Sequence, residues 1–297
     1  MGLIKLRRKK QLSKLQITVS VLFVLLAALL AAIGPGSVIM PSQTDGLYVH
    51  FIDVGQADCS LLLCGDEAML IDGGNAADSD LVYAYLEKRR IKHLKYIVNT
   101  HAHEDHVGGL SGALNYAQVD YALCPVTKYD TKVFANFVYY LAQQGKQITV
   151  PSPGDTFTIG EAQVAVLGPL QNYEETNNTS IVLRVVYGQT SFLFTGDAET
   201  AAENDLLDSG QPLRSTVLKV GHHGSNSSSS ADFLAAVAPQ YAVISCETNN
   251  SYGHPHQEVL DRLNDIGAEI YRTDKQGTII AKSDGETVTF TTEKKSH

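Results

Sequence analysis

A dense group of metal-binding side chains follows an apolar run near residue 100. The segment NTHAHEDHVGG (99–109) contains His101, His103, Asp105 and His106 within six positions. On a helix, residues two apart point about 200° away from each other, so the first two histidines could not share an ion there. In a turn between a strand and a helix they can. The spacing therefore indicates a metal site at the end of a strand.

Two further strand-like runs end in residues of the same kind. SFLFTG (191–196) is followed by Asp197, and TVLKVG (216–221) is followed by His222 and His223. A Gly–Asp pair is common in turns, and a histidine pair alone is weak evidence. Three strands that each end in ligand-type residues indicate one shared sheet edge, where a rigid scaffold can hold ions.

These candidate ligands are too numerous for one tetrahedral zinc ion. We therefore expect two divalent metal ions, zinc or manganese, although iron also suits nitrogen and oxygen donors. A carboxylate such as Asp197 can bridge two ions about 3.5–4 Å apart. Such a pair lowers the pKa of a bound water and supplies hydroxide, so the chemistry indicated is metal-assisted hydrolysis.

Apolar runs and helical patterns alternate along the rest of the chain. The expected strands are 47–54, 59–64, 68–72, 95–100, 119–124, 147–150, 163–168, 180–187, 191–196, 216–221, 241–246, 277–282 and 286–291. The expected helices are 79–90, 131–144, 198–210, 231–238 and 256–267, and another begins at Asp105. Many strand candidates are continuously apolar, as in sheets covered on both faces. We expect one α/β domain at 47–292, with a linker at 41–46 and a tail at 293–297.

The first 40 residues predict a membrane anchor. A basic tail at 1–16 precedes a segment without charge at 17–40, which is long enough to span a bilayer as a helix. The basic flank is expected to stay in the cytoplasm. The protein would then be a single-pass protein of the cell membrane with an extracytoplasmic C-terminal domain. Secretion after cleavage of a signal peptide is the alternative.

The remainder of the chain is strongly acidic. Six of the 23 Lys and Arg residues, and none of the 32 Asp and Glu residues, lie in the first 40 positions. The other positions carry 17 basic and 32 acidic side chains, a formal net charge of −15. A domain of this charge is not expected to hold nucleic acid through its overall field.

The motifs together resemble the metallo-β-lactamase superfamily. They are HAHEDHVGG (101–109), TGD (195–197), HHGS (222–225), HFIDVGQADCSLL (50–62), IDGG (71–74), NNTSIVLRV (177–185), NNSYGHP (249–255) and YRTDKQG (271–277). Within the superfamily, the series is similar to the extracytoplasmic hydrolase domain of the DNA-uptake competence protein ComEC, over about residues 48–283. The resemblance implies a four-layer αββα sandwich, preceded here by one transmembrane helix.

The resemblance also implies how the metal ligands divide. The implied ligands are His101, His103, Asp105, His106, Asp197 and His222. His101 and His103 would bind one ion, and Asp197 would bridge it to the second. The second ion would take Asp105, His106 and one histidine of the His222–His223 pair. We favour His222 as this ligand and assign His223 to a substrate or catalytic contact, and the reverse order stays open. Members of the superfamily carry another histidine before the bridging aspartate. Here Asn177, Asn178 or water would take its place.

Other residues near these motifs are candidates for substrate contacts. His254 in YGHP either belongs to a rigid turn or contacts a phosphate and protonates a leaving oxygen. Ser225 could offer its hydroxyl to the same anion. Asp58 and Asp72 are expected to orient ligating histidines or to cap the structure. The catalytic candidates are thus Asp105, His223 and His254.

The sequence therefore predicts a membrane-anchored, extracytoplasmic dinuclear metallohydrolase. The expected substrate is a phosphodiester, including single-stranded DNA, with the competence machinery as a partner. A single spanning helix cannot form a DNA pore, so the chain would be a separate nuclease or a relative directed to another ester. The alternatives are a hydrolase of phosphorylcholine esters, lactams or lactones, and a catalytically silent surface binding module.

Overall fold

The computed structural model describes residues 45–294, in which apolar strands build two sheets. β2 (Ser60–Cys64) and β10 (Thr190–Phe194) are buried at every position. Such strands need cover on both faces, as the continuous apolar runs of the sequence predict. The expected mixed α/β fold is therefore confirmed.

The first sheet has eight strands, in the order β15-β14-β1-β2-β3-β4-β5-β6. Besides β2, these are β1 (Leu47–Phe51), β3 (Glu67–Ile71), β4 (His93–Val98), β5 (Gln118–Leu123), β6 (Ile148–Thr149), β14 (Ile279–Ser283) and β15 (Val288–Thr292). The second sheet has seven strands, in the order β13-β12-β11-β10-β9-β8-β7. Besides β10, these are β7 (Thr156–Ile159), β8 (Ala162–Gly168), β9 (Val182–Tyr187), β11 (Val217–Lys219), β12 (Tyr241–Ile244) and β13 (Glu269–Arg272).

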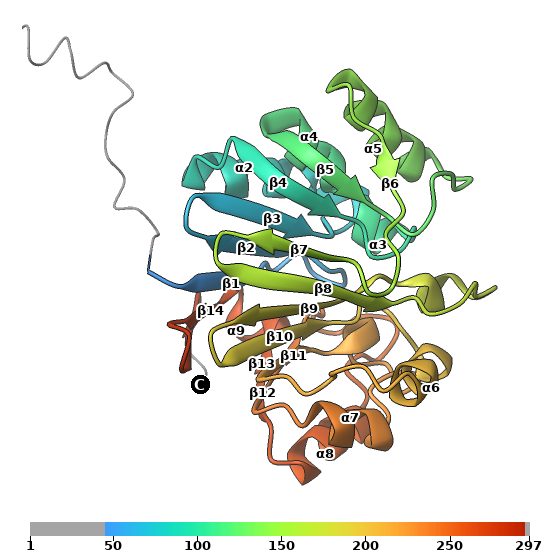
Figure 1. Cartoon of the computed structure of the whole chain (residues 1–297), viewed down its shortest axis with the longest axis vertical. Coiled ribbons are helices and arrows are strands. Elements are labelled where there is room, and N and C mark those ends of the chain that lie inside the picture. The colour runs from blue at the N-terminus through green and yellow to red at the C-terminus, as the bar shows by residue number, and fades with distance from the viewer. Residues whose placement is uncertain (1–44, 295–297) are drawn as a thin grey trace, which may run out of the picture. The chain divides into compact units, whose positions relative to one another are not determined.

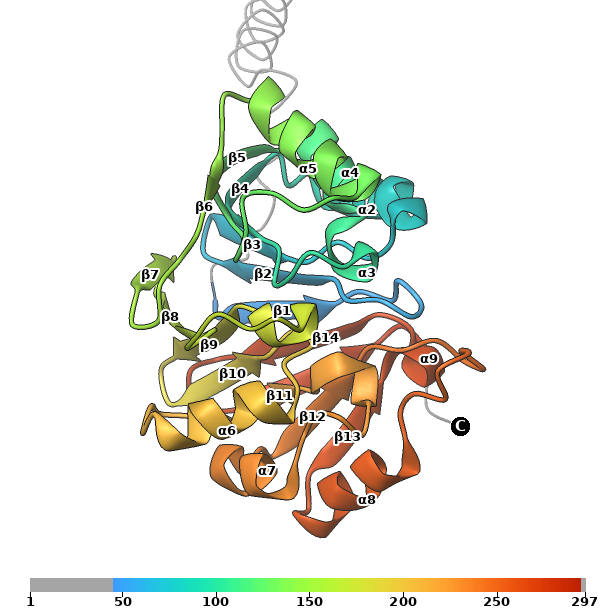
Figure 2. The ribbon, with the colours of Figure 1, turned by 90° about the vertical axis from the view of Figure 1, so that its right-hand side faces the viewer.

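Helices cover the outer face of each sheet, as Figures 1 and 2 show. The first sheet carries α2 (Ser79–Arg89), α4 (Leu110–Tyr116) and α5 (Lys132–Gln143), and the second carries α6 (Thr200–Asp208), α7 (Ala231–Val237) and α8 (Gln257–Asp265). The shorter helices are α3 (Glu104–Val107), α9 (Thr273–Gln276), η1 (Ala76–Asp78), η2 (Thr176–Thr179) and η3 (Gly221–Gly224). One cluster of buried apolar side chains lies between the sheets, and one lies under each helical layer.

Two groups of parallel strands decide where the polar loops meet. In the first sheet β3 and β4 are parallel, with Ile71 opposite Val98. In the second sheet β10, β11 and β12 are parallel, and Lys219 lies opposite both Phe194 and Val243. Parallel neighbours end at the same edge of a sheet, so the loops that follow them begin side by side.

Glycines let the loop after β3 lie directly against the HAHEDH turn. A Cβ added to Gly109 would lie 1.9 Å from the carbonyl oxygen of Gly73, and one added to Gly108 would lie 2.2 Å from the backbone nitrogen of Ala76. The amide of Gly73 also donates a 2.7 Å hydrogen bond to the carbonyl of His106. Any larger side chain at these two glycines would push the turn away from the first sheet.

The predictions for the N-terminus lie outside the described residues. They concern the basic tail at 1–16, the transmembrane segment at 17–40 and most of the linker at 41–46. Within residues 45–294, no helix has both the length and the apolar character needed to cross a bilayer. The described residues belong to one compact unit, Gln43–His297, and the predicted domain limits of 47–292 stay a prediction.

A buried histidine joins the first sheet to its helical cover. His50 of β1 is 4% exposed, and its Nδ1 lies 2.8 Å from the hydroxyl of Tyr85 in α2. The guanidinium of Arg89 stacks on the Tyr85 ring at 3.6 Å. Burial, and to a smaller extent the Arg89 charge, lowers the pKa of His50 from its ordinary 6.5 to about 3. The folded protein therefore keeps this ring neutral.

Replacing His50 is expected to make the fold less sensitive to acid. Below about pH 6.5 the unfolded chain binds a proton at His50 that the folded chain refuses until about pH 3, so stability is lost as the pH falls through this window. From pH 7 to pH 5 this amounts to about 2 kcal/mol. Urea unfolding should show a smaller loss for His50→Phe than for wild type. His93→Gln, at an exposed histidine, is the control, and an equal loss in all three proteins would contradict the assignment.

Candidate metal centre

The polar loops after the parallel strands supply the site. Asp72 follows β3, and the HAHEDH turn begins three residues after the end of β4. Asp197 follows β10, and the His222–His223 pair follows β11. The expectation of one shared sheet edge is wrong, because β4 belongs to the first sheet and β10 and β11 belong to the second. The site forms where the loops of the two sheets meet.

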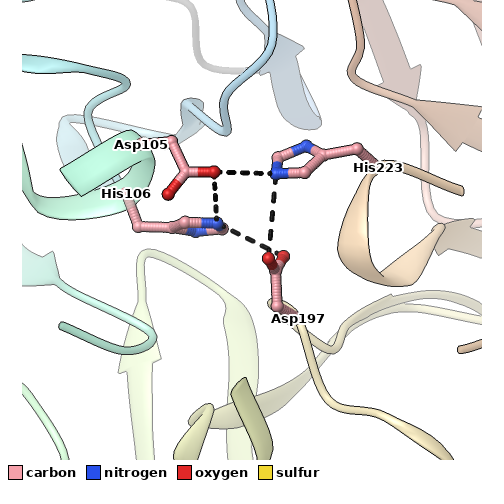
Figure 3. A group of neighbouring side chains, drawn as sticks. All are labelled: Asp105, His106, Asp197 and His223. Atoms are coloured by element: carbon pink, nitrogen blue, oxygen red, sulfur yellow. Dashed lines mark hydrogen bonds and ion pairs between the residues drawn. The ribbon is translucent and has the colours of Figure 1, made fainter. Parts of the chain in front are cut away.

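Four of the predicted residues form a tight cluster, which Figure 3 shows. Asp105 Oδ2 lies 3.3 Å from His223 Nε2, and His106 Nε2 lies 3.2 Å from Asp197 Oδ1. The remaining sides of the cluster measure 3.9 Å, between Asp105 and His106, and 3.8 Å, between His223 and Asp197. One donor atom from each residue lies within 4.8 Å of all the others. Two carboxylates and two imidazoles at this spacing suit a divalent cation.

Two buried atoms of this cluster, 3.2 Å apart, have no polar partner other than each other among the described residues. They are His106 Nε2 and Asp197 Oδ1, and both residues are at most 2% exposed. A buried polar atom without a partner costs free energy, so native structures rarely tolerate one. A metal ion would satisfy both atoms, and the residues present therefore fit the ion that their chemistry implies.

Carboxylates hold the far side of both histidine rings. His106 Nδ1 donates to Asp72 Oδ2 at 2.8 Å. His223 Nδ1 donates to the carbonyl of Ser245 at 3.1 Å, and Asp58 Oδ1 lies 3.3 Å from the same nitrogen. A ring that donates from Nδ1 has the lone pair of Nε2 free for a metal. The structure thus places Asp58 and Asp72 behind the rings that they were expected to orient.

The predicted ligands of the other ion also include residues near Asp197. His101 Nε2 is 3.1 Å from His103 Nδ1 and 3.9 Å from Asp197 Oδ2. His222 Nε2 lies 3.7 Å from the same carboxylate oxygen. Asp197 Oδ2 also lies 3.8 Å from His223 Nε2, and Oδ1 lies 3.2 Å from His106 Nε2. This carboxylate is therefore near both groups of histidines, as a bridging ligand must be.

The division of roles within the His222–His223 pair differs from the preferred assignment. The sequence analysis favoured His222 beside Asp105 and His106, but the structure puts His223 there. The cause is the backbone, because both residues have positive φ, 47° and 53°. Left-handed conformations cost about 1–3 kcal/mol each for residues other than glycine. His222 lies outside this cluster, with its Nε2 3.7 Å from Asp197 Oδ2, and it stays a predicted ligand.

Glu199 is a residue of the site that the sequence analysis missed. Its Oε1 accepts hydrogen bonds from Asn177 Nδ2 at 3.2 Å and from Ser227 Oγ at 3.0 Å, and it lies 3.3 Å from His222 Nδ1. The Glu199 amide donates to Asn178 Oδ1 at 2.9 Å. Its position two residues after Asp197, at the start of α6, was the available signal.

Asn177 and Asn178, the candidates for the place of the superfamily's additional histidine, have different environments. Asn177 Oδ1 is buried and has no hydrogen-bond partner among the described residues, and Asn177 lines the cavity in front of the cluster. Asn178 is engaged by the backbone of Glu199. Of the two, Asn177 therefore has an oxygen available for an ion or a substrate.

A cavity of about 330 Å³ opens onto the cluster. Its walls are Gln56, His103, Glu104, Asp105, Asn177, Asp197, His222, His223, Tyr252 and His254. His254 Nδ1 lies 3.3 Å from Gln56 Nε2, and the ring of Tyr252 stacks on His254 at 5.6 Å between centroids. Burial, followed by the neighbouring His222, lowers the pKa of His254 to about 4. The ring is therefore neutral at pH 7.

Ser225 does not belong to the walls of this cavity. It is 6% exposed, and its hydroxyl lies 2.9 Å from that of Ser227. The amide of Ser227 also donates to it at 3.3 Å. Its geometry supports a role in shaping the loop after η3, and the predicted substrate contact stays a prediction.

The charges of the cluster compensate one another when no metal is bound. Burial lowers the pKa of His106, but the neighbouring Asp197, Asp72 and Asp105 outweigh it and raise the pKa well above 6.5. In the same way His223, despite its burial, has a pKa raised to about 10, chiefly by Asp197 and then Asp58. A divalent ion would replace these protons, so metal binding is expected to release protons.

Known relatives match most of the described chain. ComE operon protein 3 of Bacillus subtilis is 30% identical over 81% of this chain and 34% of its own length. Competence protein ComA of Neisseria gonorrhoeae is 46% identical over 35% of the chain and 15% of its own length. Recombination protein 2 of Haemophilus influenzae is 29% identical over 78% and 28%. The chain thus spans about a third or less of the curated relatives that it matches.

Solved structures and a family model agree on the fold. The metallo-beta-lactamase fold protein YhfI of Bacillus subtilis superposes with a TM-score of 0.53 at 13% identity, covering 83% of this chain and 100% of YhfI. CmlA, a diiron β-hydroxylase of Streptomyces venezuelae, gives 0.53 at 15% identity, covering 78% of this chain and 53% of CmlA. The family model of the metallo-beta-lactamase superfamily matches residues 52–248. The chain therefore belongs to the metallo-β-lactamase superfamily, as its motifs indicated.

Proposed function

We propose that this protein is a dinuclear metallohydrolase of phosphodiester bonds, with single-stranded DNA among its substrates. The observation that carries the proposal is the cluster of Asp105, His106, Asp197 and His223, in which two buried ligand-type atoms have only each other as polar partners. The competence proteins among the relatives support a nucleic acid substrate. Two zinc or manganese ions bound here would polarise a phosphoryl oxygen and activate a water.

Side chains around the metal centre would orient the water and contact the substrate. Asp105 is 31% exposed, more than its partners in the cluster, and lies where it can orient the attacking water. His254 stands at the mouth of the cavity as a neutral ring, within reach of a leaving oxygen. Asn177 offers a free carbonyl oxygen from the opposite wall. Together these groups would hold a phosphodiester against the metal centre.

An acidic groove beside the cavity favours a second candidate. The groove has a volume of about 720 Å³ and shares Gln56, Glu104, Asp105 and Tyr252 with the cavity. Its acidic wall residues are Asp53, Asp78, Glu104, Asp105 and Glu247, and no lysine or arginine of residues 45–294 lines it. Such a wall repels a polyanion and attracts a cationic group. It therefore supports an ester that carries a positive charge, such as a phosphorylcholine ester.

The location proposed for this activity is the outer face of the cell membrane. The support is the sequence of residues 1–40, in which a basic tail precedes an uncharged segment. The competence machinery is the proposed partner, on the strength of the relatives' names alone.

Removing one cluster ligand should abolish metal-dependent hydrolysis. We expect Asp197→Asn and His106→Ala each to reduce turnover of bis(p-nitrophenyl) phosphate by the purified full chain at least about 100-fold, because each holds an ion directly. EDTA should do the same to wild type, and zinc or manganese should restore it. His93→Gln, at an exposed residue of β4, is the control. Wild-type turnover that EDTA does not reduce would refute the metal centre, and no turnover on any ester would favour the silent binding module.

The acidic groove should discriminate between the two candidate substrates. Glu247→Gln and Asp53→Asn each remove one negative charge from its wall. If a DNA strand passes through the groove, each variant should raise kcat/KM for a single-stranded oligonucleotide about 3- to 10-fold at low salt, and less at high salt. If a cationic ester occupies it, kcat/KM for p-nitrophenyl phosphorylcholine should fall instead. No change for either substrate would exclude the groove from binding.

Fractionation of cells tests the proposed anchor. The full chain should sediment with membranes and resist extraction by high salt, because residues 17–40 would lie in the bilayer. A protease added to cells whose outer layers are permeable should digest the C-terminal domain. Recovery of the chain from the medium alone would instead show that the segment is cleaved.

A further inference from the structure

Lys219 is a buried cation next to the metal centre that no mechanism discussed so far uses. It is the last residue of β11 and has parallel neighbours on both sides. Its side chain is 3% exposed. Lysine is rarely buried to this extent, because removing its charge from water is costly unless a partner compensates it. The partner should therefore indicate what the charge is for.

The partner is the carboxylate that stands behind His223. Lys219 Nζ donates to Asp58 Oδ2 at 2.8 Å and to the carbonyl of Val220 at 3.1 Å. The other oxygen, Asp58 Oδ1, makes no hydrogen bond and lies 3.3 Å from His223 Nδ1. His223 Nε2 in turn faces Asp105 and Asp197. One chain of contacts thus runs from the lysine to the cluster.

Asp58 also fixes the backbone of the metal-binding turn. Its amide donates to the carbonyl of Asp105 at 3.1 Å, and its carbonyl accepts from Gly74 at 2.8 Å. A rotation of this residue would therefore disturb both the ring of His223 and the turn that carries Asp105. Lys219 holds the side chain of Asp58 and so restrains that rotation.

The arrangement behind His106 provides a contrast. Its carboxylate, Asp72, accepts hydrogen bonds from the Thr100 amide and hydroxyl, both at 2.7 Å, and from Asn99 Nδ2 at 3.3 Å. All three donors are neutral. Asp58 instead accepts a hydrogen bond from the charged ammonium group of Lys219. The positive charge of the lysine balances the negative charge of the carboxylate and so moderates the attraction between Asp58 and the His223 ring.

We propose that Lys219 is a positioning residue of the metal centre, which acts through Asp58 to hold His223 in the orientation that binds an ion. The inference rests on the proposed metal centre but not on any substrate. The lysine touches neither the cavity wall nor a proposed ligand, so it acts by geometry and charge.

Metal affinity of the full chain tests this role. Lys219→Met keeps the length of the side chain but removes its charge, and it should weaken Zn²⁺ binding, measured by competition with a chromophoric chelator, about 10- to 100-fold. The d–d absorption of the Co²⁺-loaded chain should also change, because one imidazole is no longer held in place. Lys95→Met is the matched control, since it breaks a partly buried ion pair with Glu67 in the first sheet and should change neither readout.

A double variant keeps the test decisive if Lys219→Met does not fold. Asp58→Asn/Lys219→Met leaves no unpaired buried charge, so it is expected to fold. It should show the same 10- to 100-fold loss of affinity, because the carboxylate behind His223 is gone. A folded variant that binds Zn²⁺ within threefold of wild type overturns the inference. Failure of both variants to fold also overturns it, since the role of Lys219 would then be stability of the fold.

The outcomes separate this inference from the proposed function. A wild-type chain that binds no metal refutes the metal centre itself. A wild-type chain that binds two ions but hydrolyses no ester refutes the hydrolase, while the dependence of affinity on Lys219 can still hold. A wild-type hydrolase whose affinity ignores Lys219 refutes only the inference made here.

Discussion

The site depends on a carboxylate that lies at the centre of the molecule among histidines. Asp197 is 2% exposed and has four imidazoles within 4 Å, those of His101, His106, His222 and His223. An ionised group at this depth is tolerated only when opposite charge surrounds it. The two sheets, the parallel strand ends and the strained turn after β11 together bring that charge to it. In the metal-free chain, protons on the histidines can supply the positive charge that Asp197 needs. Divalent ions would supply more positive charge at the same place.

Much of the fold and most of the ligands could be predicted because burial of a strand produces a local pattern of apolar residues in the sequence. Strands covered on both faces read as continuous apolar runs, and their ends read as sudden groups of His and Asp. β7 and β13 were missed because they lie at the two edges of the second sheet. Their sequences, TFTI and EIYR, are only four residues long, contain exposed polar residues and lack a long apolar run. An edge strand is stabilised by pairing with a distant partner, which a local pattern does not show.

The contacts between distant segments were the part of the site that the sequence could not supply. The loop that carries His222 and His223 has a positive φ at both positions, which is uncommon for residues other than glycine. Glu199 and Lys219 look like ordinary helix and strand residues until His222 and Asp58 are placed beside them. The acidic groove likewise joins residues from four separate loops. Such pairings are set by tertiary packing, so residue type and spacing alone do not reveal them.

The two left-handed histidines have a consequence for how the centre fills. One peptide bond joins His222, which lies outside the four-residue cluster, to His223, which lies within it. A shift of this shared backbone moves both rings, so the two halves of the site share one conformational equilibrium. An ion that settles in the first half lowers the entropic cost for the next arrival. Metal binding is then expected to be cooperative, so that molecules with no ion and molecules with two ions outnumber those with a single ion.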